Sequence, residues 1–133
     1  MPDPLKLITI SISHYVEKVK WALTHSGIAD TEESHIPGLH ALATLWHTRG
    51  LHRATPVLVD GSLVVPDSTA ILRHLSTKYG QKWLYSAPAA LELEERFDRN
   101  IGPHTRRFIY QQLFDNDLSI SDLFSQGNVP GWE

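Results

Sequence analysis

Two short apolar runs on either side of an Asp-Gly pair are the feature that most narrowly limits how this chain can fold. The runs cover residues 55–59 and 62–65, and Asp60 and Gly61 lie between them. An Asp-Gly pair in this setting is the strongest short-range signal for a β-hairpin, because the matching two-residue turn needs positive φ angles. We therefore expect an antiparallel strand pair in the middle of the chain.

The segment at the start of the chain changes from strand-like to helical. Residues 5–10 form a short apolar run that is partly β-branched, which is typical of a buried strand. After the polar residues 11–14, apolar side chains recur at helical spacing, and Gly27 stands where a helix C-cap belongs. The chain is therefore expected to open with a strand, a polar turn and a helix.

Further elements lie on both sides of the hairpin. A weaker strand signal covers residues 32–36, and a helical stretch follows over 39–48. After the hairpin, Pro66, Asp67 and Ser68 are expected to begin a third helix, which runs to Tyr79. The expected order is β-α-β-α-β-β-α.

The composition excludes several classes of function. Hydrophobic residues make up 41% of the 133 positions, which is enough for a packed core. The formal net charge of −3 argues against a nucleic-acid or membrane partner, since both select for basic surfaces. The absence of cysteine excludes a disulfide scaffold, a thiolate metal site and a dithiol redox centre. No metal site is expected, because the histidines show no metal-binding spacing. With no signal peptide or membrane-spanning run in the sequence, we expect a cytoplasmic protein.

The second part of the chain has a different, helical character. A long helical pattern covers residues 89–114, with a break expected at Gly102-Pro103, because an interior proline lacks the amide hydrogen that a helix needs. A polar tail follows over 115–133. We expect two domains, residues 1–85 and 86–133, the second being part of an all-helical domain.

Three segments of the chain resemble the thioredoxin-like N-terminal domain of glutathione transferases. They are residues 13–23, 55–61 and 67–75, in the family's order and with the expected elements between them. The resemblance covers residues 5–85 and extends more loosely into 89–114. It implies an α/β fold, in which a thioredoxin-like β-α-β-α-β-β-α domain precedes the start of an all-helical domain. It also implies glutathione as co-substrate, with no separate cofactor.

A proline opens the apolar run at residues 55–59, where it cannot donate to a strand ladder. A cis Thr55–Pro56 bond would resolve this, because it turns the backbone N–H and C=O of Thr55 outward toward a ligand. The alternative is an ordinary trans proline on an edge strand. The resemblance implies that this backbone pairs with the cysteinyl part of glutathione.

Asp67 and Ser68 stand at an expected helix start, where unpaired N–H groups and the helix dipole favour a carboxylate. The plainer interpretation is a pair of capping residues, and both can hold at once. The resemblance implies that Ser68 binds the γ-glutamyl carboxylate of glutathione, and that Asp67 belongs to the same pocket.

Ser13 is the candidate catalytic residue. The resemblance to serine-type transferases implies that Ser13 donates a hydrogen bond to the glutathione thiolate. A helix N-terminus and a hydrogen bond to a charged group together supply about the 2.7 kcal/mol that ionising a thiol at neutral pH requires. The alternative is a simple N-cap. Ser11 is a rival donor and Tyr15 a weaker one, because Tyr15 falls in the first turn of the helix.

The expected function is glutathione conjugation to small electrophiles, a detoxification activity of a cytoplasmic homodimer. The glycine carboxylate of glutathione would meet a cation, and Arg53, His52 and His40 all remain candidates. The family's helical domain supplies most of the electrophile site, and we expect that part to be incomplete here. The alternative is therefore a non-catalytic interaction module, or a fragment of a full-length transferase.

Overall fold

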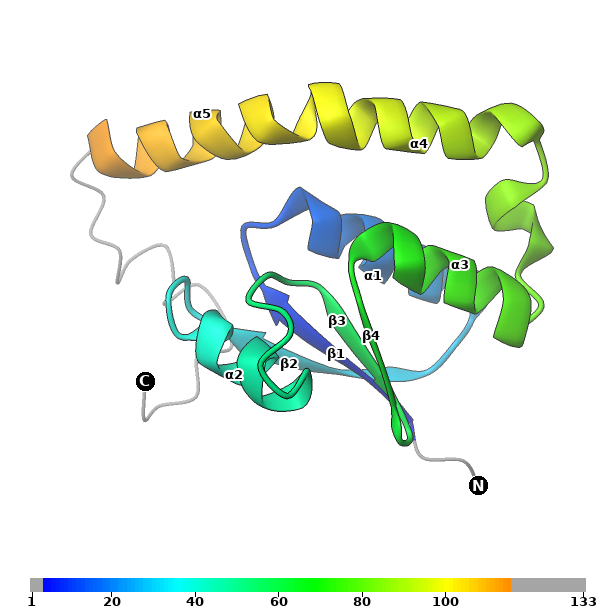
Figure 1. The fold of residues 1–133 in the computed structure, drawn as a ribbon. Coiled ribbons are helices and arrows are strands. Elements are labelled where there is room, and N and C mark those ends of the chain that lie inside the picture. The colour runs from blue at the N-terminus through cyan, green and yellow to red at the C-terminus, as the bar shows by residue number, and fades with distance from the viewer. Residues whose placement is uncertain (1–3, 116–133) are drawn as a thin grey trace. The chain divides into compact units, whose positions relative to one another are not determined.

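The structure is a computed structural model, and it describes residues 4–115 (Figure 1). The chain divides into two compact units, Met1–Leu84 and Tyr85–Glu133. In the first unit the strands and α-helices are β1 (Leu5–Ile10), α1 (His14–Ser26), β2 (Asp30–His35), α2 (His40–His47), β3 (Val57–Asp60), β4 (Leu63–Pro66) and α3 (Ser68–Lys78). A short 3-10 helix, η1 (Lys82–Tyr85), follows them. The expected element order is confirmed.

The four strands form one sheet in the order β2-β1-β3-β4. β1 runs parallel to β2 and antiparallel to β3, and β3 and β4 form the expected antiparallel hairpin. Helices α1 and α3 cover one face of this sheet and α2 covers the other (Figure 1). The two central strands are therefore buried on both faces, as their apolar sequences require.

The core lies between the sheet and the helices on its two faces. On β1, Leu7 and Ile8 are both 0% exposed, so consecutive side chains of this strand pack on opposite faces. The other buried apolar residues of the core are Leu5, Ile10, Val16, Val19, Ala22, Leu23, Val57, Leu58, Ile71, Leu72 and Leu75. The predicted apolar face of α1 is thus its buried face.

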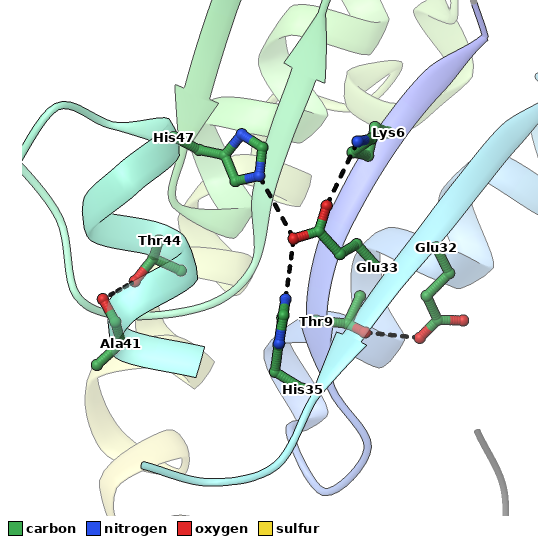
Figure 2. A network of polar contacts seen from close by, with 8 residues as sticks. All are labelled: Lys6, Thr9, Glu32, Glu33, His35, Ala41, Thr44 and His47. Carbon is green, nitrogen blue, oxygen red and sulfur yellow. Dashed lines mark hydrogen bonds and ion pairs between the residues drawn. The ribbon is translucent and has the colours of Figure 1, made fainter. Parts of the chain in front are cut away.

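Polar residues of β2 follow the same alternation. Glu32 accepts a hydrogen bond from the Thr9 hydroxyl at 2.7 Å and pairs with Lys20 of α1 at 3.1 Å. Its neighbour Glu33 points to the other side, where it meets His47 of α2 (Figure 2). The outer strand is thereby tied to the helices on both faces of the sheet.

Most element boundaries lie within two residues of those expected, but Pro66 was assigned wrongly. It was expected to begin a helix, and it is the last residue of β4, where it pairs with Val57. A proline is tolerated there because β4 is an edge strand, so the missing N–H breaks no ladder hydrogen bond. The helix itself begins at Ser68.

The second unit contains two consecutive helices, α4 (Pro88–Asn100) and α5 (Gly102–Asp115). The expected long helix over residues 89–114 is interrupted at Ile101, close to the break predicted at Gly102-Pro103. The interruption follows from Pro103, which lacks an amide hydrogen and crowds the preceding turn. Among the described residues of this unit, the exposed large apolar side chains are Leu93, Phe97, Ile101 and Phe108. The tail over residues 116–133 lies outside the described residues. No helix in the described part of the chain is long and apolar enough to cross a membrane.

Candidate functional site

The strand register brings the predicted site residues to one end of the sheet. Ile8 of β1 pairs with Val57 of β3, so continuing that register by two residues sets Thr55 opposite Ile10. Val57 also pairs with Pro66, after which Asp67 and Ser68 follow directly. The end of β1, the start of β3 and the end of β4 therefore meet. We call this end of the sheet, where the Thr55–Pro56 peptide bond is cis, the cis-proline edge.

Ser13 is the N-cap of α1 at the cis-proline edge. Its side-chain oxygen accepts a hydrogen bond from the Val16 N–H at 3.4 Å, and its backbone is extended, with φ −93° and ψ 117°. The cap uses a lone pair of Oγ and leaves the hydroxyl hydrogen available for another acceptor. Capping and thiolate binding are thus compatible at this residue.

The rivals of Ser13 are placed differently. Ser11 is exposed in the turn between β1 and α1, and Tyr15 lies in the first turn of α1, as the sequence indicated. The Tyr15 ring lies against the His14 ring, with their centroids 3.9 Å apart. At the start of α1, Ser13 is therefore the hydroxyl that stands next to unpaired helix N–H groups.

The Thr55–Pro56 peptide bond is cis. Pro56 is fully buried, whereas Thr55 is partly exposed. β3 begins at Val57, one residue later than expected for a strand opened by Pro56. The Thr55 backbone therefore lies outside the strand, at its start.

Asp67 and Ser68 begin α3 next to this bond. Asp67 is the N-cap, and its carboxylate accepts a hydrogen bond from the Ala70 N–H at 3.1 Å. Ser68 is 3% exposed. Asp67 itself is exposed and has a φ of +74°, a left-handed conformation that non-glycine residues rarely adopt. Such backbone conformations are concentrated at functional sites, and this one lies where α3 begins at the cis-proline edge.

The three candidate cations, His40, His52 and Arg53, differ in exposure and in charge. His40 is half-buried, its Nδ1 accepts a hydrogen bond from the Gly38 N–H at 3.0 Å, and burial lowers its pKa, which favours the neutral imidazole. His52 and Arg53 are both exposed, and Arg53 stands two residues before Thr55. Of these three, Arg53 carries a permanent charge next to the cis-proline edge.

Two polar clusters lie outside the predicted site. In the first, Glu33 Oε1 lies 2.9 Å from His35 Nε2 and 3.4 Å from His47 Nε2, and Glu33 Oε2 lies 3.4 Å from Lys6 Nζ (Figure 2). Burial raises the pKa of Glu33, but the hydrogen bond with His35 and the nearby His47 outweigh burial, so the pKa is lowered. This cluster joins β1, β2 and α2. Within residues 4–115, no group of three or more His, Asp or Glu side chains is arranged to hold a metal ion.

The second cluster surrounds Asp60 at the end of β3. Asp60 Oδ2 accepts hydrogen bonds from His74 Nε2 at 2.7 Å, Lys78 Nζ at 2.7 Å and the Tyr79 hydroxyl at 3.0 Å. From the sequence, Asp60 was expected only to be a turn residue. The overlooked signal is the spacing of His74 and Lys78, which are four residues apart and so share one face of α3. The cluster fastens α3, and with it Ser68, to the hairpin.

The Asp60 cluster predicts a pH-dependent loss of stability. Burial raises the pKa of Asp60, but the hydrogen bonds from Lys78, His74 and Tyr79 outweigh it, so the net pKa is lowered. A lowered carboxyl pKa stabilises the fold above the unfolded value, 3.8, and this contribution disappears as the pH falls through the folded value. Asp60→Asn keeps an Asn-Gly turn and is expected to cost about 2 kcal/mol at neutral pH.

Urea denaturation of wild type and Asp60→Asn, at neutral pH and below about pH 3, measures this difference. The gap between the two proteins should shrink in acid. Asp30→Asn is the control. Burial and the nearby Glu32 raise the pKa of Asp30, so its charge destabilises the fold at neutral pH and this substitution should raise the stability there. A gap for Asp60→Asn that stays constant with pH would contradict the assignment.

The sequence matches the family described as glutathione S-transferase, N-terminal domain, over residues 7–83. This match covers more than half of the chain. The chain belongs to the glutathione S-transferase N-terminal domain family. Among the curated proteins, none is similar enough to count as a match.

Solved structures of several glutathione transferases share this fold. A theta-class enzyme from Xanthomonas axonopodis pv. citri, solved with glutathione bound, is 28% identical, with a TM-score of 0.55 over 73% of this chain and 47% of that one. A rice enzyme in complex with glutathione is 21% identical, with a TM-score of 0.54 over 61% of this chain and 35% of its own. A poplar transferase is 15% identical, with a TM-score of 0.63 over 92% of this chain and 61% of its own.

The fold of the first unit is thus the thioredoxin-like fold of glutathione transferases, followed by further helices. Glutathione is present in the Xanthomonas and rice structures and in that of a transferase homologue from Drosophila mojavensis. The chain spans little more than a third of the rice and Drosophila proteins, 35% and 36%. The family and the fold are therefore established for a part that corresponds to the N-terminal domain of these relatives.

Proposed function

We propose that the chain binds reduced glutathione at the cis-proline edge and activates its thiol for conjugation to small electrophiles. One observation carries this proposal: the start of α1, the cis Thr55–Pro56 bond and the start of α3 meet at one end of the sheet. Two helix N-termini directed at one place favour a ligand with a carboxylate and a thiolate. Glutathione carries both groups, and three of the related structures contain it.

Each part of the peptide has a counterpart at this edge. The γ-glutamyl carboxylate meets the α3 N-terminus and Ser68, and the γ-glutamyl ammonium group meets the Asp67 carboxylate. The backbone of Thr55 pairs with the cysteinyl residue, and Arg53 meets the glycine carboxylate. Ser13 donates its hydroxyl hydrogen to the thiolate, which then attacks the electrophile. No cofactor takes part in this reaction, because glutathione itself supplies the nucleophile.

The exposed apolar face of the second unit supports a second candidate function. Leu93, Phe97, Ile101 and Phe108 are each between 45% and 62% exposed on α4 and α5. Apolar surface of this kind marks an association site, such as the interface of a homodimer. An interaction module that does not bind glutathione is the alternative, and the two functions differ in their response to glutathione.

A thermal-shift titration with reduced glutathione distinguishes the two functions. Ligand at about ten times its dissociation constant should stabilise the protein by about 1.4 kcal/mol, or roughly 5 °C. Ser68→Ala should raise the dissociation constant by about tenfold or more, because a hydrogen bond to a charged group is lost. The shift at that glutathione concentration should therefore fall to about a third of the wild-type value or less.

Ser62→Ala is the matched control for this titration, because Ser62 is exposed in the hairpin turn at the far end of β4 from Ser68. It should keep the full shift. No shift for the wild type at millimolar glutathione would overturn the enzyme proposal and leave the interaction module. An equal loss in both variants would overturn the role of Ser68.

A further inference from the structure

Exposed apolar side chains gather along α2 and in the turn that follows it. Leu39, Leu42 and Trp46 are spaced by three and four residues, which places them on one side of the helix. Leu42 is 65% exposed, Trp46 is 83% exposed, and Leu51 in the following turn is 80% exposed. Together with the exposed Arg49 they form what we call the α2 patch: Leu39, Leu42, Trp46, Arg49 and Leu51.

The other side of α2 is held against the sheet. Thr44 is fully buried, and its hydroxyl donates to the Ala41 carbonyl at 3.1 Å (Figure 2). His47 contacts Glu33 of β2 at 3.4 Å. The burial of Thr44 and the contact between His47 and Glu33 place this side of the helix against the sheet, so Leu42 and Trp46 are exposed on the other side. The exposure of the α2 patch is therefore built into the fold.

The turn after α2 is held in place by hydrogen bonds. The Gly50 N–H donates to the Leu45 carbonyl at 2.7 Å, and the Arg49 N–H donates to the Trp46 carbonyl at 3.3 Å, the two bonds of a Schellman C-cap. The Thr48 hydroxyl also accepts the His52 N–H at 2.9 Å. These bonds fix the backbone on both sides of Leu51.

Arg49 occupies a position that favours glycine. Its φ is +53°, in the left-handed region that the first residue after a Schellman helix adopts and that glycine adopts most easily. An exposed arginine here gives up backbone stability and places a permanent positive charge three residues from Trp46. A residue with a structural role alone would be expected to be glycine at this position.

The charge around the α2 patch is opposite to that of the whole chain. Residues 34–59 contain no aspartate or glutamate, two arginines and four histidines, whereas the full chain has a formal net charge of −3. Glu33, just outside this stretch, is paired with Lys6, His35 and His47, so the exposed permanent charges within residues 34–59 are those of Arg49 and Arg53. An anionic surface would therefore attract this side of the molecule. Such a distribution selects both an anionic partner and one orientation toward it.

We propose that the α2 patch docks on a membrane surface that carries anionic phospholipid headgroups. The exposed tryptophan and leucine side chains of the patch enter the headgroup boundary, where the indole ring is at its most favourable depth, and Arg49 pairs with a lipid phosphate. No membrane partner was expected from the net charge of the whole chain, because that sum hides the local excess of positive charge in residues 34–59. The docking is peripheral and does not involve glutathione.

Co-sedimentation of the full chain with phosphatidylcholine vesicles, with and without phosphatidylserine, tests the proposal. The protein should bind only the vesicles that contain phosphatidylserine, and added salt should weaken this binding. Trp46→Ala should lower the partition coefficient by about tenfold. Arg49→Gly should lower it by about fivefold, while it raises the thermal midpoint because glycine relieves the left-handed backbone.

Trp21→Ala is the matched control, because Trp21 is also exposed, at 65%, but lies on α1. It should bind vesicles as the wild type does, with its folding verified by circular dichroism. Equal binding to both kinds of vesicle, or wild-type binding by Trp46→Ala, would overturn the proposal. A wild-type protein that binds neither kind of vesicle would also overturn the proposal. If that protein instead self-associates or binds an acidic amphipathic peptide, and Trp46→Ala abolishes this association, the patch has a protein partner.

Discussion

Replacing Leu7 with alanine is expected to destabilise the protein by about 3 kcal/mol, because the substitution removes buried methyl groups and leaves a cavity that the packed core cannot fill. Leu7 is 0% exposed on the central strand β1, where it pairs with Glu32 on one side and Leu58 on the other. The same strand leads through the turn at Ser11 to Ser13. Loss of packing at Leu7 therefore also loosens one wall of the proposed glutathione site.

Chemical denaturation of the full chain measures this loss as a shift of the transition midpoint with an unchanged slope. Leu63→Ala is the matched control, because Leu63 is 48% exposed on the edge strand β4. It should change the stability by less than about 0.5 kcal/mol. Equal losses from the two substitutions would contradict the core described above.

Replacing Ser13 with alanine is expected to raise the pKa of the bound glutathione thiol by about one to two units, because a hydrogen bond to the thiolate contributes about 1.5–3 kcal/mol. At neutral pH the thiolate fraction, and with it the conjugation rate, should fall by about threefold for a rise of one unit and by about twentyfold for a rise of two. The affinity for glutathione at neutral pH should fall by no more than about fourfold, which is the part linked to the thiol pKa, since Ser68 and Thr55 still hold the peptide. The variant also loses its helix cap, which costs about 1 kcal/mol of stability.

The ultraviolet absorbance of the thiolate, followed against pH with glutathione bound, measures this pKa directly. Ser11→Ala is the control, because Ser11 is exposed in the turn two residues before the cap. It should leave the thiol pKa unchanged. A Ser13→Ala protein with the wild-type thiol pKa would contradict the role of Ser13, and a raised pKa in Ser11→Ala would transfer that role to Ser11.

Local signals in the sequence predicted most of the fold. The Asp60-Gly61 pair predicted the hairpin, and the apolar spacing of residues 16–23 predicted the buried face of α1, because each signal depends on neighbours only a few residues away. Pro66 was assigned wrongly, since its place in β4 depends on pairing with Val57, nine residues earlier in the chain. The interruption at Ile101 was expected almost where it occurs, because Pro103 breaks a helix locally.

The helix caps at the candidate site could be predicted from the sequence, and the contacts around them could not. The Ser13 cap and the Asp67 cap follow from residue type and position, whereas the hydrogen bonds of Asp60 join β3 to α3 across the tertiary fold. The left-handed backbones of Arg49 and Asp67 have no sequence signal, because each carries a residue that does not favour that conformation. The two strained positions therefore emerge only from the structure.

Amide chemical-shift mapping by NMR, with reduced glutathione added to the isotope-labelled full chain, tests the central proposal most directly. Glutathione should shift the amide signals of three separate segments at the cis-proline edge: those around Ser13, Thr55 and Ser68. Signals in the turn after α2, from Arg49 to Leu51, should stay in place. Saturating shifts confined to the three segments are the result that the proposal predicts. An unchanged spectrum at millimolar glutathione, or shifts confined to another surface, would contradict it.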